Sequence, residues 1–229
     1  YRLEIGDSIR EVRLNALIAL IGNTLALGAG ALAGSQAALR TTQTLQPYPM
    51  PRQLAPLLEH SLRLRYLEPA EVLGLYGVAA GMTVLDAGCG SGLFTQDMAH
   101  MVGAQGTVHA VDIQPAMMAL TRRRLSAANL LDRVQLHLKS VFDLPLPDDS
   151  IDLAVAVSTL GEIPDKPAAL SELRRVLKPG ARLGVTEELL HPAYLLPGSL
   201  QGWVEAAGFR QVGRTGSPLC YHAVFVNEK

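Results

Sequence analysis

The sequence predicts an α/β protein built on a doubly wound sheet, mostly parallel with a C-terminal antiparallel hairpin and preceded by an N-terminal hydrophobic helix. Three observations support this prediction. From Thr83 onward, apolar β-branched runs alternate with helical stretches. A glycine-rich turn joins the first run to the helical stretch after it. Finally, the residues from Leu14 to Leu39 contain no charged side chain.

The predicted strands are short runs rich in valine, leucine and isoleucine. The parallel candidates are Thr83 to Leu85, Thr107 to Val111, Val134 to Leu138, Ile151 to Val157 and Arg182 to Thr186. Helical stretches separate them at Phe94 to Val102, Pro115 to Ala128 and Lys166 to Leu177. A helix at Leu200 to Ala207 and strands at Phe209 to Gly213 and Tyr221 to Asn227 predict the terminal hairpin. Such a sheet places a cofactor at the C-terminal ends of its strands, where the first and fourth strands part.

The composition limits the class of protein. The chain has 229 residues, of which 48% are hydrophobic and 18% charged, with a net charge of -1 and a mean hydropathy of +0.20. These values exclude a disordered chain, and the absence of a basic excess argues against nucleic acid as a partner. Cys89 and Cys220 are too few for a metal quartet or a disulfide framework, and the histidines lack ligand spacing, so we predict no metal and a reducing compartment.

The uncharged stretch Leu14 to Leu39 allows three interpretations. As a helix it would span about 39 Å, which exceeds the roughly 30 Å of bilayer hydrocarbon. Gly30 and Gly34 form a stripe of small residues along which two helices could pack, either in a membrane or in a water-soluble dimer. Ala31-Leu32-Ala33 also resembles a signal cleavage site. We expect a membrane-associated helix, with a homodimer or membrane-complex partner at the Gly30/Gly34 stripe.

Two segments connect this stretch to the sheet. Gln46 to Gln53 has proline at every second position, which favours polyproline II and predicts a semi-rigid spacer. Helical patterns follow at Leu54 to Tyr66 and Pro69 to Tyr76. The predicted organisation is a hydrophobic helical segment at 1–45, a proline-rich spacer and helix at 46–68, and the sheet domain at 69–229.

The turn after the first predicted strand contains a glycine-rich motif that indicates a ligand-binding site. Thr83 to Thr95 reads T-V-L-D-A-G-C-G-S-G-L-F-T, in which Asp86 precedes glycines 88, 90 and 92. Glycines suit a turn that a ligand must approach closely. A dinucleotide fingerprint would need glycine at position 93, which is Leu93, so the spacing is G-x-G-x-G instead. Asp112 ends the next strand about twenty residues further on, where a ribose-binding carboxylate is expected.

This pattern resembles the first motif of the class I S-adenosylmethionine-dependent methyltransferases. Within that class, the chain as a whole looks closest to the branch that includes the quinone-biosynthesis methyltransferases. Leu177-Lys178-Pro179-Gly180 is another similar stretch, and the resemblance extends from Pro69 to the end of the chain. It implies a Rossmann-like fold with S-adenosyl-L-methionine as the cofactor. The cofactor-binding residues that it implies are Asp86, Gly88, Cys89, Gly90, Gly92, Asp112, Ile113, Ser140, Val141 and Ser158. Asp86 would order the loop, Gly88 and Gly90 would contact methionine, Asp112 the ribose and Ile113 the adenine.

One position departs from the family pattern. The family usually has an acid four residues before the Leu-Pro pair, where it accepts a hydrogen bond from adenine, and this chain has Ser140 there. A hydroxyl oxygen accepts that bond less strongly than a carboxylate does. Val141 would still contact the base. Asp143 is near enough to substitute for the acid, although an aspartate in a loop is commonly a turn residue.

Catalytic candidates must follow the fourth and fifth strands. Methyl transfer needs a base only when the acceptor carries a proton, and the protein otherwise supplies alignment and exclusion of water. Glu162 lies beside a glycine in the segment after strand four, and His191 follows strand five. Both are predicted catalytic residues. The alternative for His191 is a surface loop histidine.

These features predict methyl transfer to a small or lipidic acceptor at a membrane, with the catalytic domain on the cytoplasmic face. The alternative is a non-catalytic subunit of a membrane complex that keeps the methyltransferase fold as a structural module. Asp86, Gly88, Gly90 and Asp112 favour the enzyme. Ser140 favours the structural module.

Overall fold

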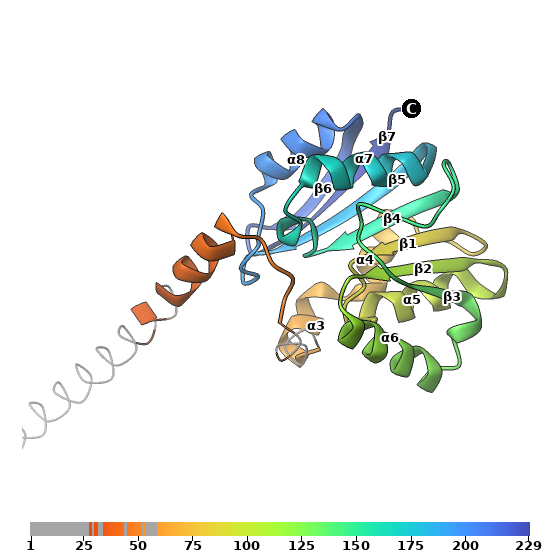
Figure 1. Ribbon diagram of the computed structural model, residues 1–229, viewed down its shortest axis with the longest axis horizontal. Coiled ribbons are helices and arrows are strands. Elements are labelled where there is room, and N and C mark those ends of the chain that lie inside the picture. The colour runs from red at the N-terminus through yellow and green to blue at the C-terminus, as the bar shows by residue number, and fades with distance from the viewer. Residues whose placement is uncertain (1–27, 29, 32–33, 44, 52, 54–58) are drawn as a thin grey trace, which may run out of the picture. The chain divides into compact units, whose positions relative to one another are not determined.

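The computed structural model describes residues 28, 30–31, 34–43, 45–51, 53 and 59–229 (Figure 1). The chain divides into two compact units, Tyr1–Thr42 and Gln43–Lys229. In the first unit residues 34–42 are helical, and the hydroxyls of Thr41 and Thr42 donate to carbonyl oxygens four residues earlier. The second unit contains the sheet, and it also includes residues 46–68, for which the sequence predicted a separate spacer and helix.

The stretch Leu14–Leu39 lies largely outside the described residues. In the part of the chain that the structure does describe, no helix has the length and hydrophobicity needed to cross a bilayer. A Cβ atom placed on Gly30 or Gly34 meets none of the described atoms within 4 Å. The membrane helix and the dimer both stay predictions.

A seven-stranded sheet with the order β3-β2-β1-β4-β5-β7-β6 organises the second unit (Figure 1). Its strands are β1 Thr83–Ala87, β2 Thr107–Asp112, β3 Val134–Leu138, β4 Ile151–Val157, β5 Leu177–Glu188, β6 Phe209–Ser217 and β7 Cys220–Asn227. The first five pair in parallel, whereas β7 runs antiparallel to both β5 and β6. The chain therefore switches direction across the sheet between β1 and β4, and this confirms the predicted switch point.

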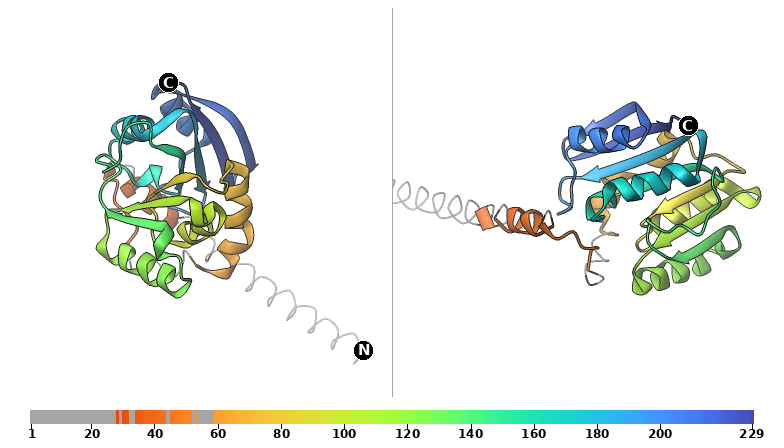
Figure 2. Two further views of the ribbon diagram at one scale, coloured as in Figure 1. Left: turned by 90° about the vertical axis from the view of Figure 1, so that its right-hand side faces the viewer. Right: turned by 45° about the horizontal axis from the view of Figure 1, so that its top comes forward.

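Helices cover both faces of the sheet (Figures 1 and 2). They are α3 Ser61–Leu67, α4 Pro69–Tyr76, α5 Leu93–Val102, α6 Pro115–Ala127, α7 Lys166–Val176 and α8 Pro197–Ala206. Leu170 of α7 and Leu200 of α8 belong to one buried core. Leu73 of α4, Met98 of α5 and Leu125 of α6 belong to the other. Burial of these apolar side chains on two faces is what a doubly wound fold requires.

The predicted fold is confirmed, with shifts at several element ends. β5 begins at Leu177, so the Leu177–Gly180 stretch is part of this strand and does not merely precede it. Leu177 pairs with Ile151, and regular pairing resumes only where Arg182 meets Leu153. Pro179 lacks an N–H and Gly180 has a φ of 73°, which is why this stretch bulges out of the ladder. β6 extends to Ser217, beyond the predicted end at Gly213.

The end of β5 carries a buried carboxyl with incomplete hydrogen bonding. The Glu187 side chain is fully buried, and its Oε2 accepts the N–H of Leu195. Its Oε1 has no hydrogen-bond partner among the described residues. Burial raises the pKa of Glu187 to about 8, with Glu188 and Glu162 adding to the rise and Lys166 opposing it. The folded state therefore holds a proton at pH 7 that the unfolded chain releases.

We expect this proton to make the protein less stable as the pH rises. The unfolded carboxyl titrates near 4.5 and the folded one near 8, so the native state binds the extra proton between these values. The unfolding free energy should fall across that window by up to about 1.4 kcal/mol per pH unit from this group. Glu187→Gln should flatten the slope, whereas Glu205→Gln, at an exposed position of α8, should not. Urea titrations at pH 5, 6, 7 and 8 give the unfolding free energy of wild type and of both variants. If the unfolding free energy of Glu187→Gln depends on pH as steeply as that of wild type, Glu187 is not the group that binds the extra proton.

Candidate cofactor site

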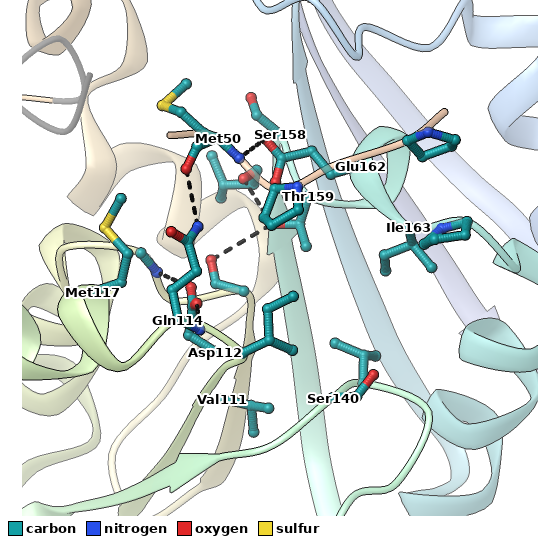
Figure 3. Close-up of a pocket in the computed structure, with 18 of the residues that line it drawn as sticks. Met50, Val111, Asp112, Gln114, Met117, Ser140, Ser158, Thr159, Glu162 and Ile163 are labelled. Carbon is teal, nitrogen blue, oxygen red and sulfur yellow. Dashed lines mark hydrogen bonds between the residues drawn. The ribbon is translucent and has the colours of Figure 1, made fainter. Parts of the chain in front are cut away.

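A cavity of about 270 Å³ lies at the C-terminal ends of β1, β2 and β4 (Figure 3). This is the switch point at which doubly wound sheets bind ligands. Its lining combines polar groups with apolar side chains and includes both glycine-loop and N-terminal residues. The residues are Pro47, Pro49, Met50, Arg63, Gly88, Gly90, Val111, Asp112, Ile113, Gln114, Met117, Lys139, Ser140, Val141, Phe142, Val157, Ser158, Thr159, Glu162, Ile163, Pro164 and His191.

The glycine loop forms one wall because its backbone turns where other residues would be strained. The φ angles of Gly88, Gly90 and Gly92 are 80°, 54° and 79°. A Cβ on Gly88 would lie 2.4 Å from the side chain of Thr159 on the opposite wall. Backbone N–H groups of Gly88 and Cys89 both donate to the carbonyl of Val111 at 2.9 Å. The loop is thereby tied to the end of β2.

Three predicted cofactor residues support the loop from behind and do not line the cavity. Asp86 is buried, and its Oδ2 accepts the hydroxyl of Thr95 at 2.5 Å. Burial raises the pKa of Asp86 to about 7, and Asp112 adds to the rise. The Cys89 thiol lies 3.8 Å from the Thr121 hydroxyl, and its burial raises its pKa. Gly92 begins α5. Asp86 connects the end of β1 to α5 behind the loop, Cys89 and Gly92 are not among the lining residues, and the cofactor contacts expected of all three stay predictions.

Asp112 joins the loop to the cavity. Its Oδ2 accepts the N–H of Gly90 at 3.0 Å and its Oδ1 accepts the N–H of Gln114 at 2.8 Å. Burial raises the pKa of Asp112, while these N–H donors oppose the rise. The carboxylate is thus oriented by two backbone groups at the position predicted for a ribose ligand.

The predicted adenine side is apolar and partly open. Ile113 is 52% exposed and Phe142 is 40% exposed, so both present apolar surface that a planar base would cover. Ser140 and Val141 line the cavity, and the Ser140 hydroxyl oxygen accepts the N–H of Phe142 at 3.3 Å. Asp143 is not among the lining residues, and its carboxylate pairs with Lys139 at 2.7 Å. Ser140, and not Asp143, therefore occupies the position of the missing acid.

A cluster of charged and polar side chains lies at the ends of β4 and β5. Glu188 is buried and accepts hydrogen bonds from Arg63 of α3, from the Tyr66 hydroxyl at 2.7 Å and from the Ser158 hydroxyl at 2.8 Å. Burial raises the pKa of Glu188, but Arg63 and the two hydroxyls outweigh it and hold the pKa below its ordinary value. Ser158, a predicted cofactor residue, has a φ of 52° and lines the cavity. The cluster attaches α3 to the sheet beside the site.

The two predicted catalytic residues meet at the cavity. His191 Nε2 lies 3.2 Å from Glu162 Oε1. His191 Nδ1 accepts the backbone N–H of Ala193 at 3.2 Å. Gly161 allows this approach, because a Cβ there would lie 1.7 Å from the carbonyl oxygen of Ala193. The side chain of His191 is only 9% exposed, so it is not the surface loop histidine of the alternative interpretation.

Several lining residues were not predicted from the sequence. Pro47, Pro49 and Met50 lie in the predicted spacer, yet they line the cavity. The backbone N–H of Met50 donates to Glu162 Oε1 at 3.1 Å, and its carbonyl accepts the Gln114 side-chain amide at 3.0 Å (Figure 3). The alternating prolines indicated an extended backbone but not where it would lie. Gln114 lies two residues after Asp112, and this closeness in the sequence could have indicated that it reaches the site.

These residues fit an adenosine cofactor that carries an amino-acid tail. Asp112 offers an oriented carboxylate for ribose hydroxyls, and the Gly88 and Gly90 turn leaves room for a ligand beside the backbone. The sequence profile of the methyltransferase domain family matches residues 79–201, which covers the glycine loop, Asp112 and the segment after β4. The chain belongs to this methyltransferase domain family. It is a class I member, and its cofactor is S-adenosylmethionine.

Individual relatives agree with the family. The chain is 32% identical over 140 residues to methyltransferase GfsG of Streptomyces halstedii, covering 61% of this chain and 48% of that protein. It is 38% identical over 106 residues to a demethylmenaquinone methyltransferase of Lactiplantibacillus plantarum, covering 46% and 45%. A solved SAM-dependent methyltransferase from Aquifex aeolicus superposes with a TM-score of 0.72 at 26% identity, covering 78% of this chain and 99% of that one. The chain spans about half the length of the curated relatives it matches.

The contact between Gly161 and Ala193 gives a packing prediction. Gly161→Ala should force apart the two loops that hold Glu162 and His191, and lower the unfolding free energy by about 1 to 3 kcal/mol. Gly198→Ala is the matched control, because Gly198 lies in α8 with open space around its Cβ position. That change should be neutral or stabilising by up to about 1 kcal/mol. Urea unfolding measures both; a Gly161→Ala protein as stable as wild type would show that the loops do not pack so closely.

Proposed function

We propose that the protein transfers a methyl group from S-adenosylmethionine to a small hydroxylated aromatic acceptor of the quinol type. The observation that carries the proposal is the cavity itself. It has Asp112 and the glycine loop on one side and Glu162 on the other. S-adenosylmethionine supplies an electrophilic methyl group when bound. The residues of the chain then have to align the acceptor and exclude water.

The apolar part of the cavity supports an acceptor with a planar apolar body. Pro47, Pro49, Ile163 and Pro164 belong to the lining, and His191 and Glu162 add polar groups suited to a hydroxyl. Apolar walls with few polar groups are typical of sites for such small molecules. The name of the Lactiplantibacillus plantarum relative, a demethylmenaquinone methyltransferase, points to the same class.

We also propose that the catalytic unit works at the cytoplasmic face of a membrane. The support is the uncharged stretch from Leu14 to Leu39, which is long enough to enter a bilayer. A membrane-embedded quinol would then be concentrated near the active site. Gly30 and Gly34 would provide the face for a homodimer or for a partner in a membrane complex.

The second candidate is a non-catalytic methyltransferase-fold subunit. The observation that favours it is Ser140, which stands where the family usually has an acid, together with the exclusion of Asp143 from the cavity. A weakened adenine contact is what such a module would show. Cofactor binding separates the two candidates, because the structural module has no need to bind either S-adenosylmethionine or S-adenosylhomocysteine.

Asp112→Ala should weaken S-adenosylmethionine binding by about 1.5 to 3 kcal/mol, because it removes charge-assisted hydrogen bonds to the ribose. Asp143→Ala removes a carboxylate that is paired at the surface and should leave binding unchanged. Calorimetric titration of wild type and both variants gives the affinities, and circular dichroism checks the fold. If wild type binds neither S-adenosylmethionine nor S-adenosylhomocysteine at millimolar concentration, the enzyme proposal fails. Equal affinity in Asp112→Ala would instead show that the ribose lies elsewhere.

The membrane proposal predicts different behaviour for the two parts of the chain. The full chain should float with liposomes of phosphatidylglycerol and phosphatidylethanolamine, whereas Gln43–Lys229, the second compact unit, should stay in the dense fraction. Both should bind S-adenosylmethionine equally. The full chain should turn over a demethylmenaquinol with a long side chain faster than the shorter chain does, and both should act alike on one with a short side chain. A full chain that stays in the dense fraction as a defined oligomer would identify residues 1–42 as a dimer arm.

A further inference from the structure

We propose that Glu162 takes the proton from the methyl acceptor through its Oε2 oxygen, and that His191 and the Met50 peptide are the positioning groups that fix it. This inference rests on the proposed function. It assigns unequal roles to the two residues that the sequence pairs as catalytic candidates. It also gives a role to the proline segment before the sheet.

The two oxygens of Glu162 differ in their surroundings. Oε1 accepts the Met50 backbone N–H at 3.1 Å and lies 3.2 Å from His191 Nε2. Oε2 receives no donor from the described part of the chain. An ionised carboxylate can accept at both oxygens. One N–H bond and the nearby imidazole therefore hold one oxygen in place and leave the other able to accept a proton.

His191 is not available as the base in this arrangement. Its Nδ1 accepts the N–H of Ala193 at 3.2 Å, so in the neutral ring the hydrogen is on Nε2. Nε2 then places its N–H beside Glu162 Oε1, 3.2 Å away. Both ring nitrogens are engaged, and neither has a free lone pair for the acceptor's proton. The ring instead restricts the rotation of the carboxylate, as the orienting partner of a catalytic group does.

Glu162 lies on the wall that faces the methionine end of the cofactor. Its backbone N–H donates to the carbonyl of Thr159, and Thr159 is the residue that a Cβ on Gly88 would strike. Figure 3 shows Glu162, Met50 and Gln114 around the same cavity as Asp112. Glu162 and Asp112 line the same cavity, and the negative charge of Glu162 contributes to the raised pKa of Asp112.

The charged groups around Glu162 come from four other parts of the fold. Asp112 at the end of β2 and Glu187 on β5 are acidic, and both feel its charge. His191 follows β5. Arg63 of α3 also lines the cavity, but its guanidinium is bonded to Glu188. Lys139, the other lining cation, is bonded to Asp143.

With a quinol as the acceptor, the reaction starts at one of its hydroxyl groups. A hydroxyl O–H bond breaks, and its proton moves to Oε2. The electron pair left on oxygen, delocalised into the ring, forms the bond from a ring carbon to the methyl carbon. The methyl–sulfur bond breaks and sulfur keeps its electron pair. The ring carbon then releases its hydrogen as a proton to water, and the oxygen recovers the proton held by Glu162.

A binding experiment tests the placement of Glu162 without any acceptor. S-adenosylmethionine carries a sulfonium charge that S-adenosylhomocysteine lacks, so a nearby carboxylate favours the first ligand. Glu162→Gln should reduce the affinity for S-adenosylmethionine relative to S-adenosylhomocysteine by about three- to tenfold. Any loosening of the Met50 segment affects both ligands alike and cancels in this ratio. Glu205→Gln, at an exposed site, is the control.

The outcomes of the titration are distinct. If the affinity for S-adenosylmethionine relative to S-adenosylhomocysteine is lower in Glu162→Gln than in wild type, the placement of Glu162 near the sulfonium is supported. If this affinity ratio is unchanged, the placement is overturned. A wild type that binds neither ligand overturns the proposed function, and this inference with it. With a short-chain demethylmenaquinol as the probe, Glu162→Gln should also lower kcat about 100-fold. A kcat equal to that of wild type would overturn the role in proton transfer even when the ratio has changed.

The positioning groups are tested with matched pairs of variants and the same ratio. Met50→Pro removes the N–H that bonds Glu162 in a segment where prolines already flank it, whereas Met50→Ala keeps that N–H. His191→Phe removes the donor, and His191→Gln replaces it with an amide N–H. We expect the ratio to fall in Met50→Pro and His191→Phe and to be retained in the other two. Nitrogen-15 NMR should show His191 protonated on Nε2; protonation on Nδ1 instead would overturn the positioning role.

Discussion

The contact that the site depends on is between the carboxylate of Asp112 and two backbone N–H groups. By accepting from Gly90 and from Gln114, it fixes the glycine loop after β1 to the end of β2 and to the start of α6. The positive φ angles of the loop are accessible because glycine occupies those positions, and the two bonds fix the loop in that conformation. The same carboxylate faces the cavity, so the group that holds the loop in place is also the group expected to hold the ribose.

The opposite wall is fixed in a similar way, by a buried carboxylate with several donors. A buried ion pair is costly to desolvate unless its remaining hydrogen bonds are satisfied, and Glu188 accepts from Arg63, Tyr66 and Ser158. Two of these donors belong to α3, which lies well before the sheet in the sequence. Together with the hydrogen bonds of Met50, this cluster makes the segment before the sheet part of the site.

The fold could be predicted because its signals are local, and much of the site could not because its contacts are not. The bounds of β3, β4 and α4 follow from β-branched runs and a proline at a first helical turn. The position of the Met50 backbone depends on partners 64 and 112 residues away, and no periodicity encodes them. Glycine spacing predicted the loop correctly. It could not tell which loop residues face the cavity and which, like Cys89, pack behind it.

The carboxyl groups gathered here also explain why this site suits a cationic ligand. Asp112 and Glu162 both line the cavity, and the charge of Glu162 adds to the rise in the pKa of Asp112 that burial causes. Among the described lining residues, Arg63 and Lys139 are cationic, and each is paired with a carboxylate. A sulfonium bound in the cavity would offset part of this repulsion and so stabilise the folded chain. The neutral thioether left after methyl transfer would lose that attraction, which favours its release.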